Sequence, residues 1–175
     1  MAGPIINIED LEFRPWGHGA VLPGQKTDAS PQFAARLGTI SARIGAQRLG
    51  YNLTVIPAGK RAFPRHNHHV NEEMFFVLEG TGEVRIGDQT YALRAGDFVA
   101  CPPGGTETAH HIVNTGTREL KFLSVSTMMS PDITDYPDSG KFGVLEFSGA
   151  DPDGRPRGNR FIGRRETSGD YWEGE

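Results

Sequence analysis

Residues 59–80 read GKRAFPRHNHHVNEEMFFVLEG, a stretch that combines an apolar run typical of a strand with three histidines. The run MFFVL at 74–78 is rich in residues that favour strands, and Gly80 follows it closely. His66 and His68 are two positions apart, so a strand would place both imidazoles on one face, with a gap that one cation can bridge. The stretch therefore predicts a β-fold that carries chemistry on one face of a strand.

Short segments of the same kind surround this stretch. We expect strands at 35–44, 49–56, 74–78, 82–86, 89–93, 97–101, 110–114 and 120–127. Turn-forming residues such as Gly45 and Gly87 separate them, and apolar residues alternate with others in 82–86 and 89–93, as in strands with one buried face. About eight short strands without intervening helices predict a double-sheet jelly roll or a small closed barrel.

Composition narrows the fold class further. The 175 residues include 23 glycines and 12 prolines, which interrupt the chain too often for an all-α bundle. Hydrophobic residues make up 37% and charged residues 23%, which excludes a chain that is disordered throughout. The length predicts one domain, with enough chain left over for an arm or a tail.

Charge and hydropathy argue against nucleic acid and membrane partners. The net charge is −4 and no basic run could follow a phosphate backbone. No stretch approaches the ~20 consecutive apolar residues that span a bilayer, and residues 1–19 are acidic where an export leader would be basic. The lone Cys101 excludes an internal disulfide and a thiolate zinc site. We therefore expect a cytoplasmic protein in which any metal is bound by histidine and carboxylate.

Three regions are expected along the chain: an N-terminal arm (1–32), a β-barrel domain (33–129) and a C-terminal extension (130–175). Prolines and glycines predict a mostly irregular extension, but its apolar residues, including Tyr171 and Trp172, should pack on the barrel or on a partner subunit. Because exposed edge strands invite pairing, the arm and the extension favour a homodimer.

Five of the six histidines fall into two groups, His66, His68 and His69 in one and His110 and His111 in the other. A His-x-His pair alone is frequent on solvent-exposed strands, so the whole arrangement carries the prediction. The predicted ligands are three imidazoles and one carboxylate, from His66, His68, Glu73 and His110. This set suits one divalent ion of Fe, Mn, Ni, Zn, Co or Cu and leaves coordination positions for water or substrate. His69 and His111 should face away by strand alternation.

The two histidine regions resemble the two motifs of the cupin superfamily. Residues 59–80 are similar to the first motif, Gly-x5-His-x-His-x3 or 4-Glu-x6-Gly, with His66, His68, Glu73 and Gly80 in place. Residues 96–114, GDFVACPPGGTETAHHIVN, are similar to the second, Gly-x5-Pro-x-Gly-x2-His-x3-Asn, with Gly96, Pro102, Gly104, His110 and Asn114 in place. The sequence has six residues between Gly59 and His66, and five between Gly104 and His110, and both departures fall in turns that tolerate insertion.

The resemblance implies an all-β cupin double-stranded β-helix, a jelly-roll β-barrel, with one metal ion inside it. The surrounding arm and tail resemble single-domain bacterial cupins described as sugar-phosphate-isomerase-like. We expect a metalloenzyme acting on a small polar molecule, sugar-like or carboxylate, by isomerase, lyase or dioxygenase chemistry. The alternative is a non-catalytic cupin that binds or stores a small molecule. The metal, the substrate and the reaction class stay open.

Two adjacent carboxylates compete for the role of oxygen ligand. Unbroken alternation from the first histidines would favour Glu72, but Asn71 indicates a turn that resets the alternation. Counting back along the strand from Gly80 favours Glu73. We expect Glu73 to be the ligand and Glu72 to face solvent or a basic residue such as Arg65.

Three further features have two interpretations each. Lys60, Arg61 and Arg65 either hold an anionic substrate at the barrel mouth or form a solvated turn. Cys101 is expected to be a buried small hydrophobic residue, in preference to a redox group. His18, in a glycine-rich part of the arm, is expected to be solvated.

Overall fold

The computed structural model describes residues 3–20, 27–150 and 156–175, whose regular structure is almost entirely β-strand. One antiparallel sheet has the order β1 (Phe13–Gly17), β2 (Ala34–Thr39), β3 (Leu49–Ile56), β10 (Leu120–Thr127), β5 (Glu73–Glu79) and β8 (Phe98–Cys101). A second has the order β7 (Gln89–Arg94), β6 (Thr81–Ile86) and β9 (His110–Val113). A third has the order β15 (Arg160–Arg164), β12 (Lys141–Leu145), β11 (Asp132–Tyr136) and β4 (Asn67–His68), and β13 (Gly149–Ala150) pairs with β14 (Pro156–Arg157).

Among the described residues, helical structure is limited to single 3-10 turns. These are η1 (Ile8–Asp10), η2 (Ser41–Arg43), η3 (Thr106–Thr108) and η4 (Arg165–Thr167). In the part of the chain that the structure describes, no helix is long and apolar enough to cross a lipid bilayer.

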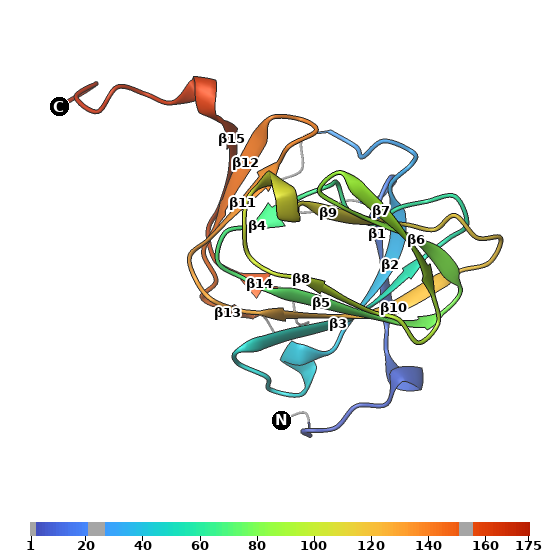
Figure 1. The fold of residues 1–175 in the computed structure, drawn as a ribbon. Helices are drawn as coiled ribbons and strands as arrows, with labels where there is room; N and C mark the ends of the chain where they lie inside the picture. Colours follow the sequence, from blue (N-terminus) through green and yellow to red (C-terminus); the bar gives the residue numbers. More distant parts are fainter. Residues whose placement is uncertain (1–2, 21–26, 151–155) are drawn as a thin grey trace.

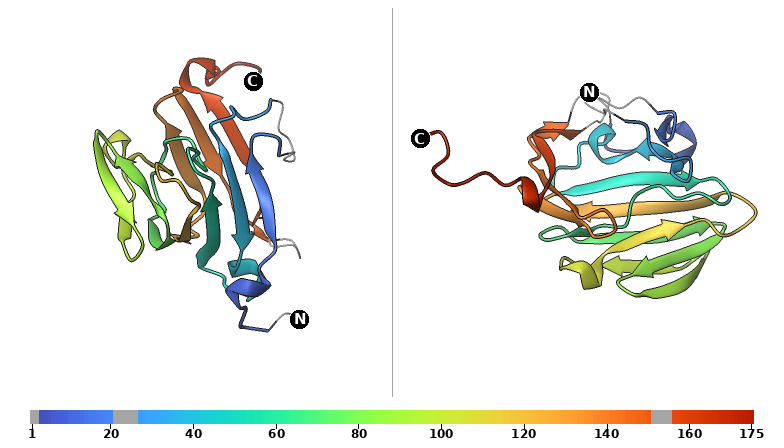
Figure 2. Two further views of the ribbon diagram at one scale, coloured as in Figure 1. Left: turned by 90° about the vertical axis from the view of Figure 1, so that its right-hand side faces the viewer. Right: turned by 90° about the horizontal axis from the view of Figure 1, so that it is seen from above.

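The sheets form two facing layers (Figures 1 and 2). The six-stranded sheet is one layer, and β6, β7 and β9 lie opposite its β10, β5 and β8 strands. An isolated antiparallel bridge between His66 and His110 links the three-stranded sheet to the segment that enters β4, and so to the four-stranded sheet. The result is the double-stranded β-helix predicted from the sequence.

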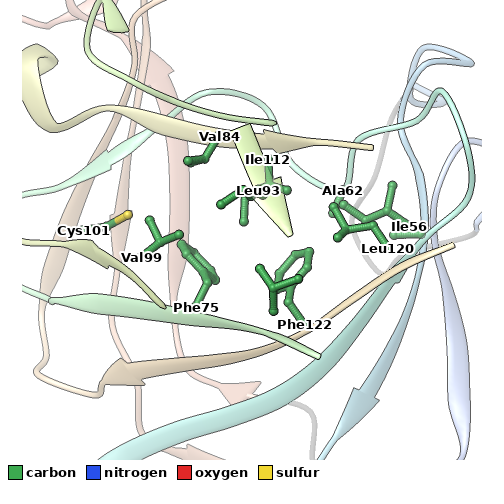
Figure 3. Packing of buried hydrophobic residues seen from close by; sticks show 12 residues of the cluster. Ile56, Ala62, Phe75, Val84, Leu93, Val99, Cys101, Ile112, Leu120 and Phe122 are labelled. Carbon is green, nitrogen blue, oxygen red and sulfur yellow. The ribbon is translucent and has the colours of Figure 1, made fainter. Parts of the chain in front are cut away.

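The core lies between the layers because alternate residues of each strand point inward. Phe75 of β5 and Phe122 of β10 come from one layer, whereas Val84 of β6 and Ile112 of β9 come from the other (Figure 3). Phe122 is 1% exposed and meets the ring of Phe75 edge to face. The two ring centroids are 5.6 Å apart, within the range of about 4.5–7 Å that is usual for such pairs. Burial of each such aromatic ring stabilises the barrel by roughly 1.5–3 kcal/mol.

The predicted strands agree closely with the structure, with one clear error. Strands predicted at 49–56 and 120–127 coincide with β3 and β10. The strand predicted at 35–44 is too long, because β2 ends at Thr39 and η2 follows it. Ile40 has right-handed helical backbone angles (φ −111°, ψ −56°), which turn the chain out of the sheet after the last β2–β3 pair, Thr39 with Asn52.

The regions on either side of the barrel are more regular than expected. Within residues 1–32, β1 pairs with β2, and the Trp16 indole N–H donates to the Ala62 carbonyl oxygen at 3.1 Å. The extension contains more regular structure than predicted, since β11, β12 and β15 form a sheet with β4. Of its predicted apolar anchors, Tyr171 and Trp172 do not pack on the barrel but are exposed. Pro131 and Pro137 stand immediately outside β11, where they interrupt no ladder hydrogen bonds. The division of the chain at residues 32 and 129 stays a prediction.

Candidate metal centre

The four predicted ligands come from separate parts of the barrel and meet between its layers. His68 lies in β4, Glu73 opens β5, and His110 opens β9. His66 stands just before β4, where its backbone exchanges hydrogen bonds with that of His110 at 3.1 and 2.8 Å. One potential ligand atom from each of His66, His68 and Glu73 lies within 4.8 Å of the others.

Three imidazole nitrogens converge on one carboxylate oxygen. The distances from Nε2 to Glu73 Oε2 are 3.8 Å for His66, 3.5 Å for His68 and 3.0 Å for His110. The side chains are largely enclosed, since His66 and His68 are 15% exposed and Glu73 is 18% exposed. The cluster therefore keeps limited contact with solvent.

The other nitrogen of each imidazole has an oxygen partner outside the cluster. His66 Nδ1 lies 2.9 Å from the Pro64 carbonyl oxygen, and His110 Nδ1 lies 3.2 Å from that of Thr108. His68 Nδ1 lies 2.6 Å from Asp132 Oδ2. A neutral imidazole that donates from Nδ1 has its lone pair on Nε2. Three such lone pairs facing an ionised carboxylate form a donor set that fits a divalent cation.

A positive charge at the centre of the cluster would be stabilised by the ionised carboxylate of Glu73. Burial by itself would raise the pKa of Glu73, but hydrogen bonds from His110 and His68 hold it well below its usual range. Burial would lower the pKa of His68, but its hydrogen bonds to Asp132 and Glu73 raise it to about 9. Burial lowers the pKa of His66 to about 4, against the opposing charge of Glu73. Without a metal, a proton on His68 supplies the positive charge that a cation would otherwise provide.

Apolar and aromatic side chains surround the cluster. A small cavity beside it is lined by Ala62, Phe63, His66, Phe75, His110, His111, Ile112 and Phe122. The ring of Tyr136, from β11, stacks on His66 with 6.1 Å between the centroids. These walls exclude bulk water, which strengthens every charge interaction within the site.

The choice between the two carboxylates agrees with the geometry. The strand does break before Glu73, although at His69 and Val70 and not at Asn71: β4 ends at His68, the chain bends at these two residues, and β5 starts at Glu73. Glu72 is exposed, while Glu73 points into the cluster. Of the two surroundings expected for Glu72, solvent is the one observed, because Arg65 is buried and donates from Nη2 to Asp138 Oδ1 at 2.8 Å.

The neighbouring histidines lie outside the cluster. His69 Nε2 pairs with Asp135 Oδ2 at 2.6 Å on the solvent side. His111 has a pKa lowered to about 4 by burial and by the charge of Arg61. His18 is half exposed beside Asp28, which agrees with a solvated histidine.

The remaining candidates have structural partners. Lys60 Nζ donates to the Pro31 carbonyl oxygen at 2.9 Å, and the Arg61 guanidinium stands 5.7 Å from the centre of the Phe33 ring. Burial raises the pKa of the Cys101 thiol to about 12, so it is a neutral part of the core.

Two contacts to the cluster come from a region where sequence reasoning assigned no site residue. Asp132 and Tyr136 belong to β11, in the extension that was predicted to be mostly irregular. The alternation of Asp132, Thr134 and Tyr136 between two prolines was the available signal of a strand. That signal says nothing about the partner strand, so it could not link Asp132 to His68.

The fold and the cluster define a class: an all-β jelly-roll protein with three histidines and one glutamate gathered inside the barrel. Residues 52–126 match the family model for the cupin domain. This matched segment, which holds all four clustered side chains, identifies a cupin domain within the chain.

Known proteins share parts of the chain or its whole fold. An uncharacterized protein from Methanocaldococcus jannaschii is 32% identical over 72 residues, which are 41% of this chain and 54% of that protein. The chain therefore matches about half the length of this relative. A putative sugar phosphate isomerase from Acidithiobacillus ferrooxidans superposes with a TM-score of 0.74 at 22% identity, covering 95% of this chain and 96% of that one. A predicted oxalate decarboxylase from Thermotoga maritima gives a TM-score of 0.56 at 18% identity, covering 71% and 99%. These two structures share the fold.

Proposed function

We propose that this chain is a mononuclear metalloenzyme acting on a small polar molecule, sugar-like or carboxylate, by isomerase, lyase or dioxygenase chemistry. The observation that carries the proposal is the convergence of three imidazole Nε2 atoms on Glu73 Oε2, each imidazole held from behind through Nδ1. His66, His68, Glu73 and His110 would bind one divalent ion of Fe, Mn, Ni, Zn, Co or Cu.

Each part of the site has a defined task in this proposal. The bound cation supplies Lewis acidity toward a substrate oxygen. Glu73, whose pKa is held well below its usual range, would supply an anionic oxygen and the three imidazoles their Nε2 atoms, so four ligands would hold the cation and other positions would be left for water or substrate. Phe63, Phe75 and Phe122 shield the site, which increases the effect of its charges on a bound molecule.

The structural neighbours support the proposed substrate class. One is called a putative sugar phosphate isomerase and another a predicted oxalate decarboxylase, and both names refer to small, polar, anionic substrates. Because these proteins share only the fold with this chain, we propose the substrate class and keep the three reaction classes together.

A non-catalytic binding or storage role is the second candidate. Among the residues that line the described cavity, His111 is the only polar side chain besides the proposed ligands. A reaction that moves a proton needs a further acid or base within reach of the substrate. Apart from His111, whose pKa burial lowers to about 4, the cavity offers only proposed metal ligands and apolar walls, which is the observation that supports binding without turnover.

Elemental analysis of the protein as isolated tests the metal centre. The variants His66→Ala, His68→Ala and His110→Ala should each lose metal while circular dichroism still shows a β-fold, because the core consists of apolar residues. His69→Ala, which removes a neighbouring histidine outside the cluster, should keep the wild-type metal content. Full occupancy in all three cluster variants would overturn the assignment.

Turnover assays then separate the two roles. Oxygen uptake by the metal-loaded protein with small carboxylates would identify a dioxygenase. Isomerisation or decarboxylation of sugar phosphates and dicarboxylates, followed by NMR, would identify the other two classes. Tight binding of these compounds without conversion would favour the storage role.

We also propose that the protein is a cytoplasmic homodimer. The outer face of β5 and its edge neighbour β8 carries stacked rings of Phe76 and Phe98, 4.4 Å apart, and Phe98 is 71% exposed. Met74 and Leu123 lie on the same outer face by register. A second copy would cover this apolar face, and the cytoplasm suits a protein whose single cysteine cannot form an internal disulfide.

A further inference from the structure

The C-terminal extension reaches the histidine cluster through one side chain. Strand β11 pairs with β4, with Thr134 opposite His68. Asp132 is two residues from Thr134 on the same face of β11, and its Oδ2 lies 2.6 Å from His68 Nδ1. His66 and His110 have backbone carbonyl partners at Nδ1, so His68 alone among the three is held there by a carboxylate.

We propose that Asp132 is a positioning residue of the metal centre, which holds the Nδ1 proton of His68 so that the Nε2 lone pair points toward Glu73. The inference rests on the proposed function, because it assigns a task to Asp132 only if the cluster binds metal. A carboxylate at this place orients the imidazole and makes its other nitrogen a stronger donor.

The Asp132 carboxylate has little freedom to adopt another arrangement. Its side chain is 1% exposed, and its second oxygen, Oδ1, accepts the Val70 backbone N–H at 3.1 Å. Both oxygens are thus engaged, one by the backbone between the ligands and one by a ligand itself. Burying a carboxylate costs free energy unless such hydrogen bonds compensate it. The two hydrogen bonds of Asp132 therefore hold β11, and with it the extension, next to the histidine cluster.

An asparagine amide in the same place cannot accept hydrogen bonds from both the Val70 N–H and His68 Nδ1–H with separate oxygens, as the Asp132 carboxylate does. Asparagine has one acceptor oxygen, so if that oxygen keeps the Val70 N–H, its NH2 group faces His68 Nδ1. Nδ1 must then accept a hydrogen bond, which moves the imidazole proton to Nε2 and removes the lone pair needed by a metal. Asp132→Asn is therefore a nearly isosteric change that disturbs the tautomer of His68.

The same strand contains a matched control. Asp135 makes an equally short contact, 2.6 Å from Oδ2 to His69 Nε2, but this pair lies outside the cluster. Asp135→Asn makes the same chemical change on β11 and alters a histidine that faces away from the proposed ligands. A general effect of weakening β11 would appear in both variants.

The experiment measures Zn²⁺ affinity of the full chain by competition with a chromogenic chelator. We expect Asp132→Asn to bind Zn²⁺ about 10–100-fold more weakly than wild type, the usual effect of losing such a partner, and Asp135→Asn to match wild type. Equal affinity of Asp132→Asn and wild type would overturn the inference while leaving the metal centre intact. Failure of the wild type to bind Zn²⁺ would overturn the metal centre itself and the inference with it.

A second measurement needs no variant and stands even if Asp132→Asn fails to fold. Long-range ¹H–¹⁵N NMR of the zinc-loaded wild type reports which nitrogen of His68 carries the proton. We expect Nδ1 to be protonated and Nε2 to bind zinc. Zinc bound to His68 through Nδ1 would overturn the inference, whatever the affinity.

Discussion

Removal of metal should leave a protein whose stability falls between pH 6.5 and pH 9 because of one histidine. In the metal-free protein His68 lies between two carboxylates, with Nδ1 2.6 Å from Asp132 Oδ2 and Nε2 3.5 Å from Glu73 Oε2. Burial favours the neutral imidazole, but these partners outweigh burial and raise its pKa to about 9. The protonated form is therefore the one that the folded state stabilises.

The sign and size of the effect follow from linkage. The pKa of His68 is raised in the folded state, so its contribution is fully present below pH 6.5 and is lost as the pH rises through about 9. At 1.36 kcal/mol per pH unit, this interval corresponds to about 3 kcal/mol. His66 acts in the opposite sense, because its pKa is lowered to about 4 and the folded state loses stability as the pH falls from 6.5 toward that value.

Urea unfolding of the chelator-treated protein at intervals from pH 6.5 to pH 9 measures the free energy of unfolding. Wild type and His69→Gln should lose about 3 kcal/mol over this range, whereas His68→Gln should lose much less. The range stops at pH 9 because above it the Cys101 thiol, whose pKa is raised to about 12 in the folded state, adds its own pH dependence. The reasoning would be refuted if the free energy of unfolding of wild type stayed level or rose from pH 6.5 to pH 9, or if it fell equally in His68→Gln.

Three further predictions test other parts of the molecule. Glu73→Gln should bind much less metal while Glu72→Gln keeps the wild-type content by elemental analysis, and the reverse result would mean that Glu72 is the oxygen ligand. Phe122→Ala should lower the free energy of unfolding in urea by about 3–5 kcal/mol, because it empties a fully buried ring site, and a loss below about 1 kcal/mol would contradict the packing described. Phe98→Asp should convert a dimer to a monomer in light scattering at micromolar concentration, and a monomeric wild type would contradict the proposed interface.

The barrel was predictable because its signals are local. The alternation of apolar residues, together with turns at glycine and proline, predicted β3 and β10 at their observed bounds. Both signals depend only on residues a few positions apart in the sequence. The gathering of His66, His68 and Glu73 was predictable for the same reason, since spacing along two short strands decides which side chains share a face. His110 could be added to the predicted ligands because it is the first residue of the strand predicted at 110–114.

The sequence by itself determined the all-β class, most strand positions and the composition of the histidine and glutamate cluster. Only the tertiary structure decided that β11 pairs with β4, that Asp132 therefore reaches His68, and that Tyr136 covers His66. Asp132 and His68 are 64 residues apart in sequence. Local backbone preference can mark each strand, but strand pairing at this separation depends on the burial and hydrogen bonds gained when the whole sheet assembles.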